Sequence, residues 1–164
     1  MAGIEAGRSQ APQDPRFEIE SAFVLCSIGH DYENNKNRIT AALRESRDDP
    51  RFDSVAAERM ITRLIRRGDA SLLSELFNAA SWSDGALSEA LSDTFGEQLV
   101  RNPKDFLLSL NVAGSARQNV LKLIGGSSLS QNEMNELKAY LTSAGVPFSL
   151  RPVAKELLAN LRSK

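Results

Sequence analysis

The sequence has one cysteine and one histidine among its 164 residues. A single cysteine excludes a disulfide within the chain, which fits a reducing compartment. We therefore expect a cytoplasmic protein, with a periplasmic or secreted location after removal of a leader as the alternative. One cysteine and one histidine are also too few to supply the three or four protein ligands of a typical zinc site. The sequence predicts no metal site and no cofactor.

Long hydrophobic runs and phosphate-binding motifs are missing as well. The longest strongly apolar run, Ala22 to Cys26, is far shorter than the roughly 20 residues that span a bilayer, so we expect no membrane span. No nucleophile-elbow, phosphate-loop or dinucleotide-binding fingerprint occurs in the sequence. The formal net charge of -1 indicates no overall attraction to nucleic acid or anionic lipid.

Strand patterns are nearly absent, because no segment alternates apolar and polar residues over more than a few positions. Signals that open helices recur instead, about 32 to 37 residues apart, at Pro15, Pro50, Ser83, Ser115 and Pro152. The tetrapeptide Asp14–Phe17 recurs in identical order as Asp49–Phe52. A second helix-sized segment lies between successive signals, and this pattern is typical of stacked helical hairpins.

The apolar spacing predicts nine helices, at about residues 15–28, 36–47, 53–67, 70–80, 84–100, 103–110, 115–125, 130–145 and 152–161. We expect Asp69 to cap the fourth of these helices. Capping boxes are expected at Ser115 with Gln118 and at Ser130 with Glu133. Residues 1–13 are expected to form a flexible tail, and residues 14–164 a single all-helical domain.

The period and pattern of residues 14–162 resemble those of the HEAT and armadillo families of helical repeats. This resemblance implies an α-α superhelix of stacked hairpins, and a compact multi-helix bundle is the alternative all-α fold. The tetratricopeptide signature is not present, since no Leu-Gly pair follows Trp82. The consensus of HEAT repeats matches no individual residue of this chain, so the resemblance implies no functional residue.

Charge alternates along the chain, with net values of -4 over residues 1–35, +4 over 36–67, -5 over 69–105 and +4 over 117–164. Within the first positive block one helical face carries four arginines, namely Arg59, Arg63, Arg66 and Arg67. A ridge of guanidinium groups can bind carboxylates or phosphates bidentately. The alternative is a solvated face that pairs with acids of the neighbouring hairpin.

Three other residues are candidates for a functional role. Trp82 is either an exposed anchor for a partner or a cover over one end of the core. Cys26 and His30 have a spacing that can place two metal ligands on one helical face, but Gly29 is expected to end the helix before His30. Cys26 falls on the apolar stripe, so we expect a buried thiol with a raised pKa and not a nucleophile.

These patterns favour a non-catalytic protein–protein interaction module or scaffold whose partner is another protein. One alternative is an all-helical enzyme that uses scattered carboxylates such as Glu58, Glu75 or Glu89. Another is a weak binder of polyanions or nucleic acid through the arginine ridge. Aromatic residues do not interleave with the arginines, which disfavours single-stranded nucleic acid. The sequence does not indicate an oligomeric state.

Overall fold

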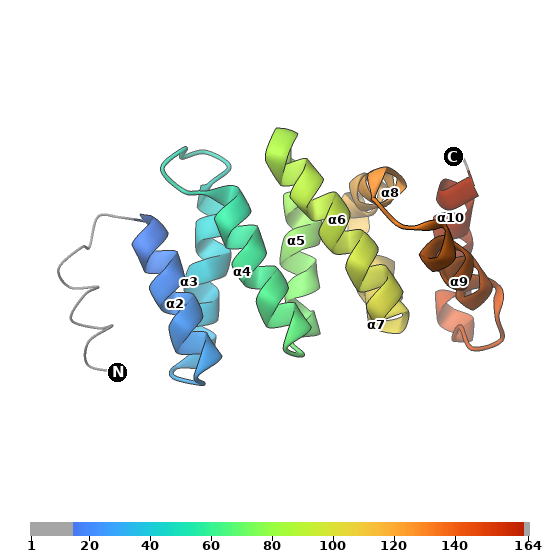
Figure 1. The fold of residues 1–164 in the computed structure, drawn as a ribbon, viewed down its shortest axis with the longest axis horizontal. Coiled ribbons are helices and arrows are strands. Elements are labelled where there is room, and N and C mark those ends of the chain that lie inside the picture. The colour runs from blue at the N-terminus through green and yellow to red at the C-terminus, as the bar shows by residue number, and fades with distance from the viewer. Residues whose placement is uncertain (1–14, 163–164) are drawn as a thin grey trace. The chain divides into compact units, whose positions relative to one another are not determined.

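The computed structural model describes residues 15–162, and that range holds nine α-helices, three short 3₁₀ helices and no strand (Figure 1). The all-α fold that the sequence predicts is therefore confirmed, and more than half of the chain is helical. The expected tail, residues 1–13, lies outside the described residues. No described helix has both the length and the hydropathy needed to cross a bilayer. The elements in chain order are α2 (Pro15–Ser27), α3 (Tyr32–Glu45), α4 (Ser54–Arg66), η1 (Ala70–Leu72), α5 (Leu73–Ala79), α6 (Gly85–Arg101), α7 (Pro103–Asn111), η2 (Gly114–Ala116), α8 (Arg117–Gly126), α9 (Gln131–Thr142), η3 (Phe148–Leu150) and α10 (Arg151–Arg162).

The chain divides into two compact units, of which the first ends at Asp69 and the second begins at Ala70. The expectation of one domain over residues 14–164 stays a prediction. In the first unit α3 packs against both α2 and α4, and α2 also contacts α4. The apolar stripes of the three helices meet in a core from which water is excluded. This core contains Ile19, Ala22, Leu25, Ile39, Leu43, Ala57, Ile61 and Leu64, each at most 3% exposed.

Helix α3 begins at Tyr32, four residues before the predicted start at residue 36, so that predicted start is wrong. Asp31 precedes the helix in a left-handed conformation with φ 44°. The buried Asn35 donates from Nδ2 to the carbonyl oxygens of His30 and Asp31, at 3.0 and 3.1 Å. Glu33 in the first turn suits the positive end of the helix dipole. These local bonds stabilise the start of α3. Because asparagine has a low helix propensity, the sequence pattern alone does not predict this start.

Helix α4 begins after Asp53, whose carboxylate accepts a hydrogen bond of 2.9 Å from the backbone N–H of Ala56. Gly68, with φ 113°, follows the last turn of the helix, where a left-handed conformation favours glycine. Asp69 directly precedes the 3₁₀ helix η1, and its predicted role as a helix cap stays a prediction. The Asp69 carboxylate accepts a 2.8 Å hydrogen bond from the Tyr32 hydroxyl and lies 3.4 Å from Lys36 Nζ. Asp69 therefore joins the residues after α4 to the start of α3.

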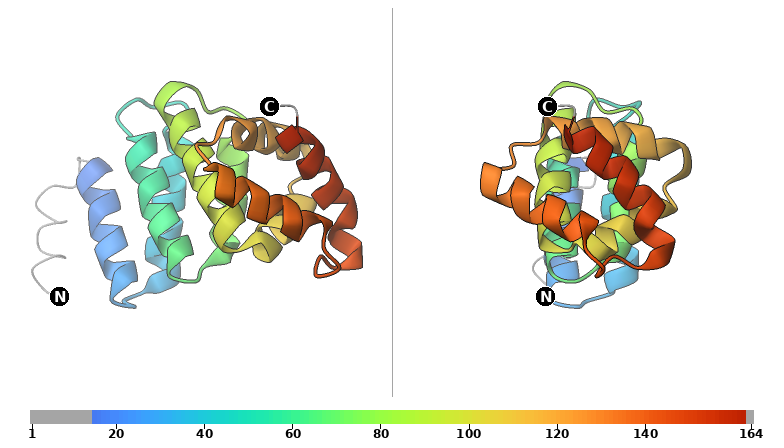
Figure 2. Two further views of the ribbon diagram at one scale, coloured as in Figure 1. Left: turned by 45° about the vertical axis from the view of Figure 1, so that its right-hand side comes forward. Right: turned by 90° about the vertical axis from the view of Figure 1, so that its right-hand side faces the viewer.

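The core of the second unit is built around three phenylalanine rings from three helices. Phe77 of α5, Phe95 of α6 and Phe106 of α7 are each at most 1% exposed. Their ring centroids lie 5.3, 5.1 and 6.1 Å apart in edge-to-face geometry. Such pairs add to the free energy of burial, so the cluster fixes how α5, α6 and α7 pack. Helix α8 packs against α6, and α10 covers both α8 and α9 (Figure 2).

The two predicted capping boxes have different outcomes. Ser130 caps α9, with both reciprocal bonds to Glu133 present, so this box is confirmed. The box at Ser115 is wrong, because Ser115 lies within the 3₁₀ helix η2 and α8 begins only at Arg117. Gln118 donates from Nε2 to Glu156 Oε1 of α10, at 2.7 Å. Its side chain makes a tertiary contact that sequence spacing alone does not indicate.

Candidate partner-binding surface

The four arginines predicted to form a ridge lie along α4, from its middle to its C-terminus, and directly after it, and all four are exposed. Successive side chains of Arg59, Arg63 and Arg67 are four residues apart, which is about 6 Å along a helix. The only carboxylate of α4 belongs to Glu58, which is 2% exposed and accepts a 2.7 Å hydrogen bond from Thr62. The solvent face of α4 therefore carries positive charge and no exposed acid.

An aromatic ring of the neighbouring helix orients two of these arginines. The guanidinium carbons of Arg63 and Arg67 lie 5.7 and 5.5 Å from the ring centroid of Phe23 in α2. At this distance the negative face of the ring attracts the cations. Among the described residues of the first unit, no carboxylate pairs with Arg59, Arg63 or Arg67. We name Phe23, Arg59, Arg63, Arg66 and Arg67 the arginine–phenylalanine surface.

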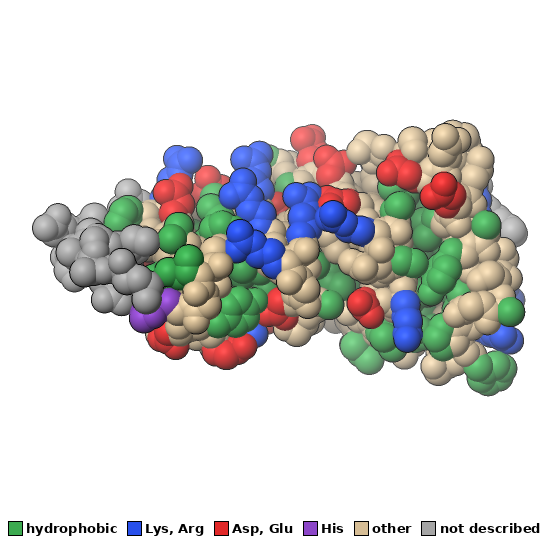
Figure 3. Space-filling view, turned by 60° about the horizontal axis from the view of Figure 1, so that its bottom comes forward, with side chains coloured by type: hydrophobic (Ala, Val, Ile, Leu, Met, Phe, Trp, Pro, Cys, Tyr) green, Lys and Arg blue, Asp and Glu red, His purple; other side chains and the backbone are tan. Residues whose placement is uncertain are grey.

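Exposed apolar side chains lie on α2 and directly after it. Val24 of α2 is 41% exposed, and Ile28, which follows the end of that helix, is 56% exposed. Figure 3 shows Lys and Arg side chains, and also hydrophobic side chains, exposed on the face that it draws. A cationic surface suits a partner that carries carboxylates.

Trp82 lies outside this surface, in the turn between α5 and α6 of the second unit. Its backbone N–H donates to the carbonyl oxygen of Ala79 at 3.1 Å, and its side chain is half-buried. Helix α6 starts only at Gly85. A contact between Trp82 and a partner stays a prediction.

Cys26 is 5% exposed, as its place on the apolar stripe predicts. Its Sγ donates to the carbonyl oxygen of Tyr32 at 3.5 Å. Burial raises the pKa of the thiol from 9.0 to about 11, so the nucleophilic thiolate is scarce at neutral pH. Gly29, with φ 73°, follows the end of α2 at Ser27, so His30 lies outside the helix that holds Cys26. Across residues 15–162 no group of three or more His, Cys, Asp or Glu side chains could hold a metal ion.

The three carboxylates considered for an enzyme lie on three different helices and differ in burial. Glu58 is buried against Thr62. Glu75 belongs to α5 and is half-buried, whereas Glu89 belongs to α6 and is exposed. General acid–base chemistry needs ionisable groups that converge on one position in a cleft. The positions of these residues give no support to the enzyme alternative.

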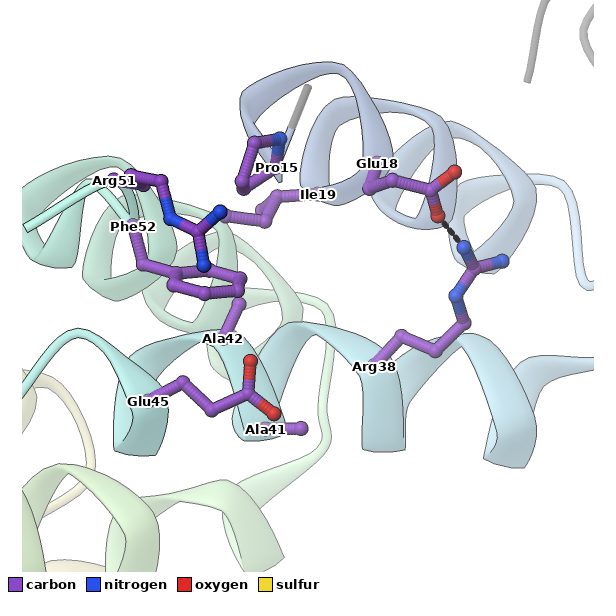
Figure 4. Close-up of a pocket in the computed structure, with 9 residues that line it drawn as sticks. All are labelled: Pro15, Glu18, Ile19, Arg38, Ala41, Ala42, Glu45, Arg51 and Phe52. Atoms are coloured by element: carbon purple, nitrogen blue, oxygen red, sulfur yellow. Dashed lines mark ion pairs between the residues drawn. The ribbon is translucent and has the colours of Figure 1, made fainter. Parts of the chain in front are cut away.

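A cavity of about 680 Å³ lies in the first unit, between the N-terminus of α2, the second half of α3 and the turn before α4. No pattern in the sequence predicts this cavity. Figure 4 shows Glu18 and Arg38 on one side of the cavity and Arg51 with Phe52 on the other. The carboxylate of Glu45 points in from α3. The remaining lining residues are Pro15, Ile19, Ala41 and Ala42.

Both arginines of the cavity are bound by carboxylates. Arg38 forms an ion pair with Glu18 across the gap between α3 and α2. Arg51 binds Asp49 through Nε, at 3.0 and 3.1 Å, and through Nη2, at 2.6 Å. The hydrogen bonds from Arg51 hold the pKa of Asp49 below its ordinary value. The cavity therefore contains two neutralised guanidinium groups and one further carboxylate, that of Glu45.

The repeated tetrapeptide was the signal that could have located this cavity. Pro15 belongs to its first copy, and Arg51 and Phe52 belong to its second copy. Periodicity explains the first copy as a helix start, but the second copy lies in a turn that ends before α4.

Comparison of the chain with protein-family models, curated proteins and solved structures finds no match.

Proposed function

We propose that this chain is a non-catalytic protein-interaction module, built from HEAT- or armadillo-like helical hairpins, whose arginine–phenylalanine surface binds an acidic segment of another protein. The observation that carries the proposal is the placement of two guanidinium groups over the single ring of Phe23. Stacking reduces the conformational freedom that Arg63 and Arg67 lose when they bind a carboxylate.

The charge distribution of the first unit supports the binding of an anionic partner. Like charges that lie close together repel each other, and an anionic partner relieves that repulsion. Within the first unit no described carboxylate pairs with Arg59, Arg63 or Arg67 and relieves their repulsion. Val24 and Ile28 expose apolar area elsewhere on the same unit, and phosphate groups of a nucleic acid would not bury it. These features favour an acidic protein over a nucleic acid.

The test compares charge reversal at two exposed arginines of the first unit, with poly-L-glutamate as the probe. Arg63→Glu is expected to lower the affinity at least tenfold, which corresponds to about 1.4 kcal/mol. Arg47→Glu is the matched control, because it changes the net charge equally at a side chain 62% exposed and away from the surface. Binding should weaken as ionic strength rises. Equal losses in both variants would contradict a specific surface.

A second variant separates orientation from charge. Phe23→Leu keeps all four arginines and an apolar side chain but removes the ring on which Arg63 and Arg67 stack. We expect affinity for poly-L-glutamate to fall severalfold, because the guanidinium groups lose their preferred orientation. An unchanged affinity would show that stacking plays no part. Tighter binding of duplex DNA than of poly-L-glutamate, at equal ionic strength, would replace the protein partner with a nucleic acid.

Stability measurements guard against misfolded variants. An exposed cation–π contact contributes about 0.5–1 kcal/mol, so Arg63→Glu should lower the melting temperature by only a few degrees. A larger loss would show that Arg63 stabilises the fold, and partner binding would then belong to another face. Circular dichroism of each variant before titration supplies this measurement.

A further inference from the structure

The cavity of the first unit has a chemistry different from that of the arginine–phenylalanine surface. Its aliphatic lining comes from Ile19 of α2 and from Ala41 and Ala42 of α3. Phe52 adds an aromatic ring, and the carboxylate of Glu45 faces the cavity (Figure 4). A volume of about 680 Å³ lies within the range of pockets that hold small organic ligands, roughly 300–1,000 Å³.

The charges of the cavity favour a cation as its ligand. Glu18 neutralises Arg38, and Asp49 holds Arg51 through three short contacts, so an anion would have to compete with a carboxylate already in place. No basic side chain among the described residues of this unit pairs with Glu45. The lining residues together with Asp49 carry two positive and three negative charges, which leaves one negative charge in excess.

We propose that this cavity binds the basic side chain, arginine or lysine, of a partner protein segment. The cationic head pairs with the Glu45 carboxylate and lies against the Phe52 ring, which attracts cations through its face. The aliphatic stem contacts Ile19, Ala41 and Ala42, as long basic side chains do when they cover apolar surface. The site is independent of the arginine–phenylalanine surface, so either proposal can fail alone.

The experiment titrates the full chain, labelled with ¹⁵N, with Nα-acetyl-L-arginine methylamide. Saturable shifts of the backbone amide signals of Ala41, Ala42 and Phe52 are expected. Nα-acetyl-L-norleucine methylamide has a similar stem without the charge, and we expect it to bind at least fivefold more weakly. Equal binding of both compounds would overturn the role of charge. Tighter binding of Nα-acetyl-L-glutamate methylamide would show that Arg38 and Arg51 select an anion.

Two variants test the residues that carry the proposal. Glu45→Gln keeps the size of the side chain, removes its charge and is expected to weaken arginine binding at least fivefold. Glu20→Gln is the matched control, because Glu20 is an exposed carboxylate of α2 that does not line the cavity. Phe52→Leu should weaken binding by removing the aromatic face. Unchanged affinity in Glu45→Gln, with amide spectra that show an intact fold, would overturn the proposal.

The same variants separate the two sites. Glu45→Gln should leave poly-L-glutamate binding unchanged, and Arg63→Glu should leave binding of the arginine compound unchanged. Loss of both activities in either variant would show that the two sites are not independent, which contradicts the proposal as stated.

Discussion

Replacing Phe106 by alanine should destabilise the second unit by about 4–5 kcal/mol. The Phe106 ring is 0% exposed and contacts Phe77 and Phe95, at centroid distances of 5.1 and 6.1 Å. Removing a buried phenylalanine ring from a core costs about 3–5 kcal/mol. Loss of two edge-to-face contacts, each about 0.5–1.5 kcal/mol beyond burial, places the cost in the upper half of that range.

The matched control makes the same substitution at an exposed ring. Phe148 is 83% exposed, so Phe148→Ala should change the free energy of unfolding by no more than about 0.5 kcal/mol. Urea unfolding followed by the fluorescence of Trp82, the only tryptophan, measures both variants within the same unit. If Phe106→Ala and Phe148→Ala differed by less than about 1 kcal/mol, the aromatic cluster would not be the core of this unit.

A double-mutant cycle keeps the test informative if Phe106→Ala does not fold. Phe106→Leu and Phe77→Leu retain apolar side chains and remove one ring each. Their coupling free energy should be about 0.5–1.5 kcal/mol, because the rings contact each other directly. Strict additivity of the two changes would mean that the ring contact itself contributes nothing.

Three further predictions concern the core, the buried thiol and a helix cap. Leu64→Ala and Leu107→Ala, at residues 2% and 0% exposed, should each cost about 2–5 kcal/mol in chemical denaturation, and costs under about 1 kcal/mol would contradict their burial. Cys26 should react with iodoacetamide at least tenfold more slowly in the folded than in the urea-unfolded chain. The stability due to its raised pKa should be complete below pH 9.0 and lost as pH rises through about 11, since the thiol of the unfolded state ionises first. If the free energy of unfolding depended on alkaline pH in the same way for the wild-type chain and a Cys26→Ser variant, this reasoning would be refuted. Ser130→Ala should cost about 0.5–2 kcal/mol, whereas Ser115→Ala, which removes no cap, should be close to neutral by thermal denaturation.

Local signals in the sequence predicted most helices and several of their ends. Ser130 with Glu133 and Gly68 satisfy backbone groups within the same helix end, so their roles depend on spacing of a few residues. The burial of Cys26 followed from its place on an apolar stripe. The predicted start of α3 is four residues too late because asparagine is a common residue in loops. The Asn35 side chain instead supports the helix start through its hydrogen bonds.

The sequence by itself determined the all-α fold, the apolar stripes and the arginine ridge, because all three follow from the 3.6-residue period of a helix. Only the tertiary structure decided that Phe23 of α2 lies beneath Arg63 of α4 and Arg67 directly after it, some forty residues later. It likewise brought Pro15 and Phe52 to one cavity with Glu45. Periodicity shows which face of a helix is polar, but the side chain that a polar face meets depends on how helices pack, and packing is a property of the whole core.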